Sequence, residues 1–122
     1  MTSLSSYRDL IVWQKSIDLT VAIYARTRRF PADERYGITS QMRRAAASIP
    51  ANIAEGQARR TTGEFLQSLG IARGSLAELE TFVTLCERLG LMPNEACESL
   101  SNDCAEINKM LRALMRSLTT RR

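Results

Sequence analysis

Two long stretches of the chain repeat apolar residues at alternating steps of four and three positions. This is the heptad spacing of a helix that buries one face. In the stretch 62–89 the repeated residues are Phe65, Leu69, Ala72, Leu76, Leu79, Val83 and Cys86. In the stretch 94–118 they are Cys97, Leu100, Cys104, Ile107, Leu111, Leu114 and Leu118. The pattern therefore predicts two long helices, over residues 62–89 and 94–118.

The residues that flank these stretches are typical of helix ends. Thr61 and Glu64 have the spacing of a capping box at a helix start. Gly90 follows Arg88 as a glycine follows the end of many helices, and Pro93 suits the first turn of the next helix.

Two further helices are predicted in the first half of the chain, over residues 9–28 and 37–56. In the first we expect one apolar stripe toward the core, formed by Leu10, Trp13, Ile17, Val21 and Tyr24. Leu19 and Ile23 widen this stripe. In the second the corresponding residues are Ile38, Met42, Ala45, Ile49 and Ile53. Pro50 removes one backbone hydrogen bond and crowds the carbonyl of Ala46, so we expect a kink near residues 46–50.

The arrangement of these four segments indicates the fold. No stretch alternates apolar and polar residues as a strand does. Short connections favour antiparallel neighbours, so we predict an all-α, antiparallel up-down-up-down four-helix bundle with a kinked second helix. Residues 1–122 are expected to form this single domain. No apolar run approaches the roughly 18–20 residues that a membrane span needs, so no membrane is expected as a partner.

The most specific motifs begin near the end of the first predicted helix. They are Phe-Pro-Ala-Asp-Glu-Arg-Tyr-Gly-Ile at 30–38, Thr-Ser-Gln-Met-Arg-Arg-Ala-Ala at 39–46 and Ser-Ile-Pro-Ala-Asn-Ile-Ala-Glu-Gly at 48–56. Leu-Ile-Val-Trp-Gln-Lys at 10–15 and Gly-Ser-Leu-Ala-Glu-Leu-Glu-Thr at 74–81 accompany them. Over about residues 7–118, the chain resembles the four-helix-bundle proteins encoded in bacterial 23S rRNA intervening sequences.

This resemblance carries expectations about assembly and partners. It implies a left-handed bundle that assembles as a toroidal homopentamer. It also implies kinship with the accessory protein of diversity-generating retroelements, a basic pentamer that contacts a reverse transcriptase and nucleic acid. A nucleic-acid-handling protein is therefore one expected partner, and RNA or DNA is another.

Composition narrows the chemistry that the chain can perform. It holds fifteen arginines, two lysines and no histidine. Without histidine, the commonest general base and the commonest zinc ligand are both missing. Nothing singles out a pair of carboxylates for acid–base work, and no Gly-rich phosphate loop is present. We therefore expect that the protein has no enzymatic activity, no cofactor and no metal site.

Three cysteines, Cys86, Cys97 and Cys104, stand in the chain without paired spacing. An odd number argues against a secreted disulfide framework, and a cytoplasmic location is the default. Cys97 and Cys104 occupy core positions of their heptad, where cysteine behaves as a small hydrophobe.

The net charge of +4 is unevenly distributed along the chain. Residues 1–60 carry ten basic and five acidic side chains, whereas residues 61–122 carry seven and eight. We therefore expect the first half to build the basic surface. The candidate nucleic-acid-binding residues are Arg28, Arg29, Arg43, Arg44, Arg59 and Arg60.

Arginine offers a planar fork that matches phosphate oxygens, which favours an oligomeric scaffold for nucleic acid. Arginines near helix ends also complement the helix dipole, and they can form salt bridges between subunits. The alternative function is therefore a protein–protein adaptor without nucleic-acid binding.

A line of polar residues shares one face of the second predicted helix: Arg44, Ser48, Asn52, Glu55 and Arg59. The first four predict an ordered structural network, with Arg44 and Glu55 as candidate ion partners. Phosphate binding by Arg44 and Arg59, or simple exposure, are the other interpretations.

Three more features bear on packing and assembly. Gly70 and Gly74 lie four apart within a helix, which suggests a close contact with another helix, within the chain or between subunits. Tyr36 falls in a connection, where it packs or stacks on a base. Apolar residues off the main heptads suggest extra surface for assembly: Leu19, Ile23, Phe82, Leu85 and Leu89.

Overall fold

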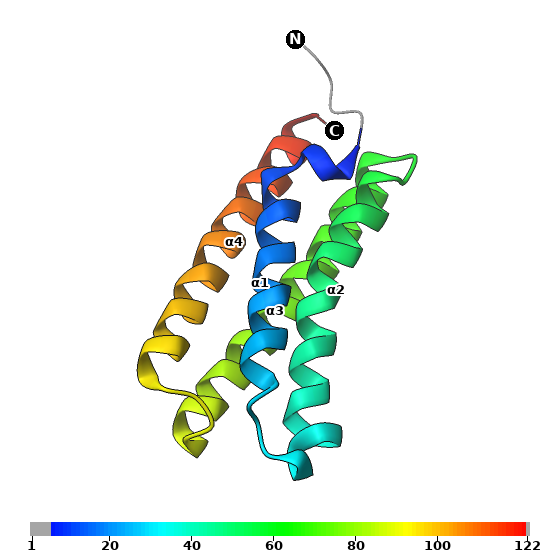
Figure 1. Cartoon of the computed structure of the whole chain (residues 1–122). Coiled ribbons are helices and arrows are strands. Elements are labelled where there is room, and N and C mark those ends of the chain that lie inside the picture. Colours follow the sequence, from blue (N-terminus) through cyan, green and yellow to red (C-terminus); the bar gives the residue numbers. More distant parts are fainter. Residues whose placement is uncertain (1–5, 122) are drawn as a thin grey trace.

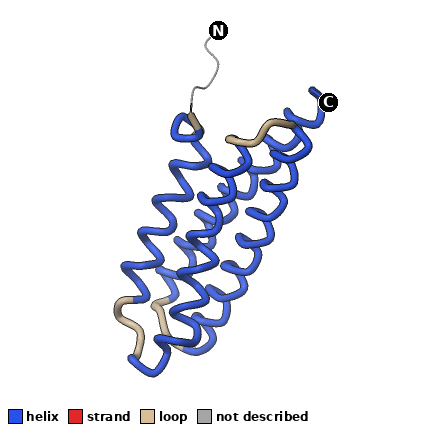
Figure 2. The backbone as a smooth tube through the Cα atoms, turned by 90° about the vertical axis from the view of Figure 1, so that its right-hand side faces the viewer, coloured by secondary structure: helices blue, strands red, loops and turns tan. Residues whose placement is uncertain are grey.

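The computed structural model describes residues 6–121, and these form one bundle of four helices (Figure 1). The helices are α1 (Ile11–Thr27), α2 (Ser40–Gln57), α3 (Thr62–Leu89) and α4 (Asn94–Arg121). Successive helices run in opposite directions, and the described chain holds helices and loops without a strand (Figure 2). The predicted all-α four-helix bundle is confirmed. Residues 1–5 and 122 of the predicted domain lie outside the described residues.

The helix bounds agree closely with the sequence pattern in the second half and less closely in the first. Helix α3 has the predicted bounds, and α4 continues three residues beyond the predicted end at 118. A short turn of 3-10 helix, η1 (Tyr7–Asp9), precedes α1, and Leu10 between them is extended. None of the helices in the described part of the chain has the length and apolar character required to span a membrane.

Local contacts explain where α3 begins and ends. The Thr61 hydroxyl accepts a hydrogen bond from the Glu64 backbone N–H at 3.1 Å, which caps the first turn. Gly90 adopts a left-handed conformation with φ 71°. The backbone N–H groups of Gly90 and Leu91 then donate to the carbonyls of Glu87 and Cys86, at 3.2 and 2.9 Å. This Schellman motif reverses the chain into α4.

The heptad residues of α3 and α4 form the core, as predicted. Leu69, Leu79, Cys104 and Leu111 are completely buried, and their neighbours on the same stripes are nearly so. Two positions of these stripes, Phe65 and Leu114, are partly buried against this core. Close packing of these stripes against α1 and α2 supplies the main hydrophobic stabilisation of the fold.

The prediction for α1 was wrong in part: Leu10 and Trp13 pack partly buried against the core, but the fully buried face is a neighbouring one. Its core residues are Val12, Ser16, Leu19, Ile23 and Thr27. Val21 of the predicted stripe is 63% exposed, and Tyr24 is 39% exposed. Leu19 and Ile23 are therefore core residues and not surplus apolar surface.

The chain reaches α2 through two short non-α segments. They are η2 (Ala32–Glu34) and the π-helical η3 (Arg35–Thr39). Gly37 within η3 has non-helical backbone angles, with φ −104° and ψ −116°, so the chain kinks there. Helix α2 is continuous through the buried Pro50, and a bend at residues 46–50 stays a prediction.

The close approach of α2 and α3 occurs at Gly56, which is buried. A Cβ atom on Gly56 would lie 2.7 Å from the Ser68 Cβ and 2.9 Å from the Phe65 Cδ1. Gly70 and Gly74 are exposed, and a Cβ on either meets nothing within 4 Å. The helix contact predicted at these two glycines is therefore absent within the chain.

Candidate functional site

The six predicted nucleic-acid-binding arginines lie at opposite ends of the bundle. Arg28 and Arg29 follow α1 directly, and Arg43 and Arg44 occupy the beginning of α2, at the same end. Arg59 and Arg60 lie between α2 and α3, at the other end (Figure 1). From Arg44 to its end at Gln57, α2 extends about 20 Å at 1.5 Å per residue, which separates the two groups. The six arginines thus form two separate surfaces.

A cavity of about 300 Å³ opens where α1 connects to α2. Three arginines from different segments line it: Arg28 after α1, Arg35 in η3 and Arg43 in α2. The remaining lining residues are Thr27, Phe30, Pro31, Ala32 and Thr39. Arg35 was not among the predicted residues, because only the folding of the connection brings it beside Arg28 and Arg43. We call Arg28, Arg29, Arg35 and Arg44 with this cavity the α1–α2 basic surface.

Arg43 holds α2 against the end of α1. Its Nε donates to the Thr27 hydroxyl at 2.8 Å, and its Nη2 lies 3.5 Å from the Tyr24 carbonyl oxygen. The guanidinium carbon lies 4.5 Å from the centre of the Tyr24 ring, a cation–π distance. Its positive charge also faces the negative end of the α1 dipole. The role of Arg43 is thus structural, although one edge of it lines the cavity.

The other arginines at this end are exposed. Arg28, Arg29, Arg35 and Arg44 form no ion pair with a carboxylate of the described residues. Arg44 donates from Nη2 to the Gln41 Oε1 at 2.5 Å on its own helix. Their guanidinium groups remain accessible to a ligand.

Tyr36 adds an aromatic ring beside these charges. It follows Arg35 directly in η3, and it is 88% exposed, the largest exposed fraction among the exposed large apolar side chains of the described chain. An exposed ring next to arginines is the combination that stacks on unpaired bases.

The predicted polar network on α2 is shorter than expected and reaches α3. The Ser48 hydroxyl lies 2.8 Å from the Ser75 hydroxyl on α3. Asn52 donates from Nδ2 to the Ser48 carbonyl and hydroxyl oxygens, at 2.8 and 3.0 Å. Glu55 pairs with Arg59 at 3.5 Å, so the predicted pair between Arg44 and Glu55 does not form within the chain.

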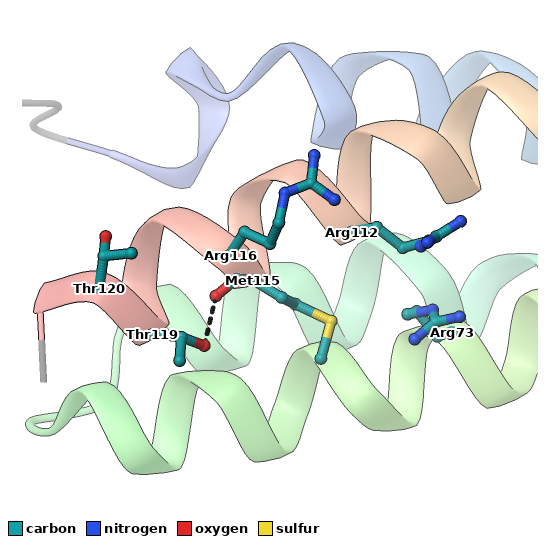
Figure 3. Close-up of a pocket in the computed structure, with 6 residues that line it drawn as sticks. All are labelled: Arg73, Arg112, Met115, Arg116, Thr119 and Thr120. Atoms are coloured by element: carbon teal, nitrogen blue, oxygen red, sulfur yellow. Dashed lines mark hydrogen bonds between the residues drawn. The ribbon is translucent and has the colours of Figure 1, made fainter.

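A second arginine-lined cavity lies between α3 and α4, nearer the end that carries Arg59 and Arg60 (Figure 3). Its volume is about 440 Å³, and its charged residues are Arg73, Arg112 and Arg116. The sequence analysis did not predict this cluster, because residues 61–122 carry one more acidic than basic side chain. Along α4 the charges separate, with acidic residues in the first half and basic residues in the second.

The acidic half of α4 forms a groove of its own. Glu95, Glu98 and Asp103 line it together with Ser99 and Asn102. None of the three carboxylates forms an ion pair with another described residue. The groove therefore presents uncompensated negative charge.

The three cysteines are free and buried. Burial raises the pKa of the Cys86 thiol to about 11 and that of Cys104 to about 12, because the interior disfavours the charged thiolate. Smaller contributions to these values come from Cys97 and Glu34 beside Cys86, and from Glu80 and Asp103 beside Cys104. Among the described residues no group of three or more histidine, cysteine or acidic side chains is placed to hold a metal ion. These thiols act as core residues.

Comparison with known proteins places the chain in a family. The family model of the 23S rRNA-intervening sequence protein matches residues 8–113. A crystal structure of a protein of unknown function from the S23 ribosomal protein family of Bacteroides thetaiotaomicron is similar, with 30% sequence identity and a TM-score of 0.76. The match covers 86% of this chain and 98% of that one. No curated protein matches the sequence. The chain belongs to the family of 23S rRNA-intervening sequence proteins.

Proposed function

We propose that this protein is a non-enzymatic, oligomeric scaffold that binds the phosphate backbone of RNA or DNA through its α1–α2 basic surface. The observation that carries the proposal is the cavity where Arg28, Arg35 and Arg43 converge, flanked by the exposed Arg29 and Arg44. Each exposed guanidinium can donate two parallel hydrogen bonds to phosphate oxygens. Binding of this kind is largely independent of sequence and weakens as salt rises.

Single-stranded nucleic acid suits this surface better than duplex. Tyr36 stands free beside Arg35, and base–aromatic stacking contributes about 1–3 kcal/mol per base. In a duplex the bases already stack on one another, so no base face is free to stack on the Tyr36 ring. We therefore place the backbone along the arginines and one base on Tyr36.

Self-assembly is part of the proposal. The family resemblance implies a homopentamer, and exposed apolar side chains on α3 support contacts between copies: Ile71 is 51% exposed and Leu89 62%. A ring of copies would repeat the basic surface and raise the local concentration of arginines along one strand. Free, buried cysteines fit a reducing compartment, so we place the protein in the cytoplasm.

The acidic groove on α4 favours a second candidate, a protein–protein adaptor. In this version Glu95 and Glu98 of one copy pair with arginines of another copy, and nucleic acid has no part. Charge complementarity of this kind steers and orients protein association.

Fluorescence anisotropy of labelled single-stranded RNA and DNA at two salt concentrations tests the scaffold. The variant carrying Arg29→Ala and Arg35→Ala is compared with one carrying Arg8→Ala and Arg88→Ala. Both pairs are exposed and remove the same charge. We expect the first pair of substitutions to weaken binding about 10-fold. The slope of log Kobs against log salt concentration should become shallower by about 1.4, because two phosphate contacts to a single strand are lost.

The same measurements separate the two candidates. Equal loss in the two variants would show that only overall charge matters. Absence of binding at low salt rejects the scaffold, and salt-dependent dissociation of the oligomer, followed by light scattering, then identifies the adaptor.

A further inference from the structure

The cavity between α3 and α4 is lined by three arginines from two helices. Arg112 and Arg116 lie one turn apart on α4, and Arg73 lies across from Arg112 on α3, whereas the Arg116 guanidinium extends away from both. Figure 3 shows the guanidinium groups of Arg73 and Arg112 beside one another, with the Met115 side chain reaching toward α3. Thr119 and Thr120 complete the lining.

The helix dipole does not account for this cluster. Cations are favoured only within about the last turn of a helix. Arg112 lies nine residues before the end of α4 at Arg121, and Arg73 lies in the interior of α3. Arg73 is instead positioned by Asn108 of α4, whose Oδ1 accepts from its Nε at 3.2 Å.

The three charges are also uncompensated within the described chain. None of them forms an ion pair with a carboxylate of residues 6–121. Like charges gathered in one cavity repel one another, and a bound anion would remove that repulsion. The Thr119 and Thr120 hydroxyls donate to the carbonyls of Met115 and Ser117, at 2.8 and 2.9 Å. The donors available to a ligand are therefore guanidinium groups.

We propose that this cavity is a phosphate-binding site, separate from the α1–α2 basic surface. Paired guanidinium groups match the oxygens of a phosphate, whereas a carboxylate ligand would satisfy fewer of the donors. The hollow is open to solvent and has a volume of about 440 Å³, which leaves room for a sugar or base beside the phosphate on the apolar surface of Met115. The phosphate comes from a free nucleotide or from a nucleic-acid backbone. The site does not depend on the proposed scaffold function.

Calorimetry with inorganic pyrophosphate and with a single-stranded oligonucleotide tests the site. The background protein carries Arg29→Ala and Arg35→Ala, which weakens the α1–α2 basic surface. Two variants are made in this background. The cavity pair carries Arg73→Ala and Arg112→Ala, and the control pair carries Arg8→Ala and Arg88→Ala. Thermal melting checks that both variants remain folded.

We expect the cavity pair to weaken pyrophosphate binding at least 10-fold and the control pair less than 2-fold. Arg73→Lys, which keeps the charge and loses the planar fork, should fall between them. Loss of oligonucleotide binding alongside supports a backbone phosphate as ligand, and unchanged oligonucleotide binding supports a free nucleotide. Equal pyrophosphate affinity in the cavity and control variants overturns the proposal, whether or not the scaffold function holds.

Discussion

The hydroxyl of Thr20 on α1 lies 3.1 Å from the carbonyl oxygen of Ala46 on α2. That carbonyl is the one that Pro50, four residues later, leaves without its helical N–H donor. Ala46 is completely buried, so water cannot replace the missing donor. The Thr20 oxygen also lies 2.8 Å from the Ser16 carbonyl of its own helix, so one proton is shared between two acceptors. A residue of α1 thus compensates for a proline in α2.

We predict that Thr20→Val destabilises the protein by about 1–3 kcal/mol, because it leaves the buried Ala46 carbonyl unsatisfied. Valine keeps the shape of threonine and removes only the hydroxyl. Thr20→Ser, which keeps the hydroxyl, should lose less than half as much. Urea denaturation followed by circular dichroism measures both. Equal losses in the two variants would show that the methyl group matters and the hydrogen bond does not.

Arg43 and Arg44 are adjacent, yet we expect different effects when each is replaced. Arg43→Ala removes a hydrogen bond to Thr27 and a cation–π contact with Tyr24, and should cost about 1–3 kcal/mol of stability. Arg44→Ala should change stability by less than about 0.5 kcal/mol, because the side chain is exposed. Thermal melting of the two variants measures both changes in stability. A larger loss for Arg44→Ala contradicts the structural role given to Arg43.

The glycines provide a matched pair of substitutions. Gly56→Ala places a Cβ 2.7 Å from that of Ser68, so α2 and α3 must move apart, at a cost of about 1–3 kcal/mol. Gly70→Ala meets no atom and should stabilise α3 by about 0.5–1 kcal/mol. Denaturant unfolding measures both values. If Gly70→Ala instead destabilises the protein and reduces its mass in light scattering, Gly70 packs against another copy.

The buried thiols should make the stability of the fold decrease with pH in the alkaline range. Burial raises the pKa values of Cys86 and Cys104 in the folded protein, whereas exposed thiols ionise near 9.0. Their stabilisation is therefore complete below pH 9 and is lost as the pH rises toward 11–12. Each thiol contributes a slope of up to about 1.4 kcal/mol per pH unit in that window.

The control for the thiols is Cys104→Ala, measured by urea unfolding from pH 7.5 to 10.5. Its stability should be lower at pH 7.5 because of the lost packing, and should fall less steeply with pH than that of the parent protein. Parallel pH profiles for the two proteins would rule out the thiol contribution.

The fold was predictable where one apolar stripe dominates a helix. In α3 and α4, residues such as Leu76 and Ile107 leave one possible buried face. In α1 apolar residues lie on several faces, and the choice between them depends on α2 and α4. Ser16 and Thr27 can occupy the buried face because their hydroxyls donate to carbonyls of their own helix, to Trp13 at 2.8 Å and Ile23 at 2.7 Å.

The candidate sites were predictable only where charges are neighbours in sequence. Arg28 and Arg43 were found, since each has a second arginine directly after it in the sequence. Arg73 meets Arg112 only through the register between α3 and α4, which heptad spacing does not determine. Arg35 was missed because no other arginine is next to it in the sequence, and only the folded connection brings it to the cavity.

Each helix packs mainly on a helix adjacent to it along the chain, and the α1–α4 contact that closes the bundle is the smallest of the four. Such local connectivity gives a low contact order, and we expect folding within microseconds to milliseconds. The α1–α4 contact joins the most distant parts of the chain, so its closure carries the largest loop-entropy cost. Hydrogen exchange should therefore find this edge opening first, beside the ion pair of Lys15 with Glu106, while the α2–α3 pair stays protected until the whole bundle unfolds.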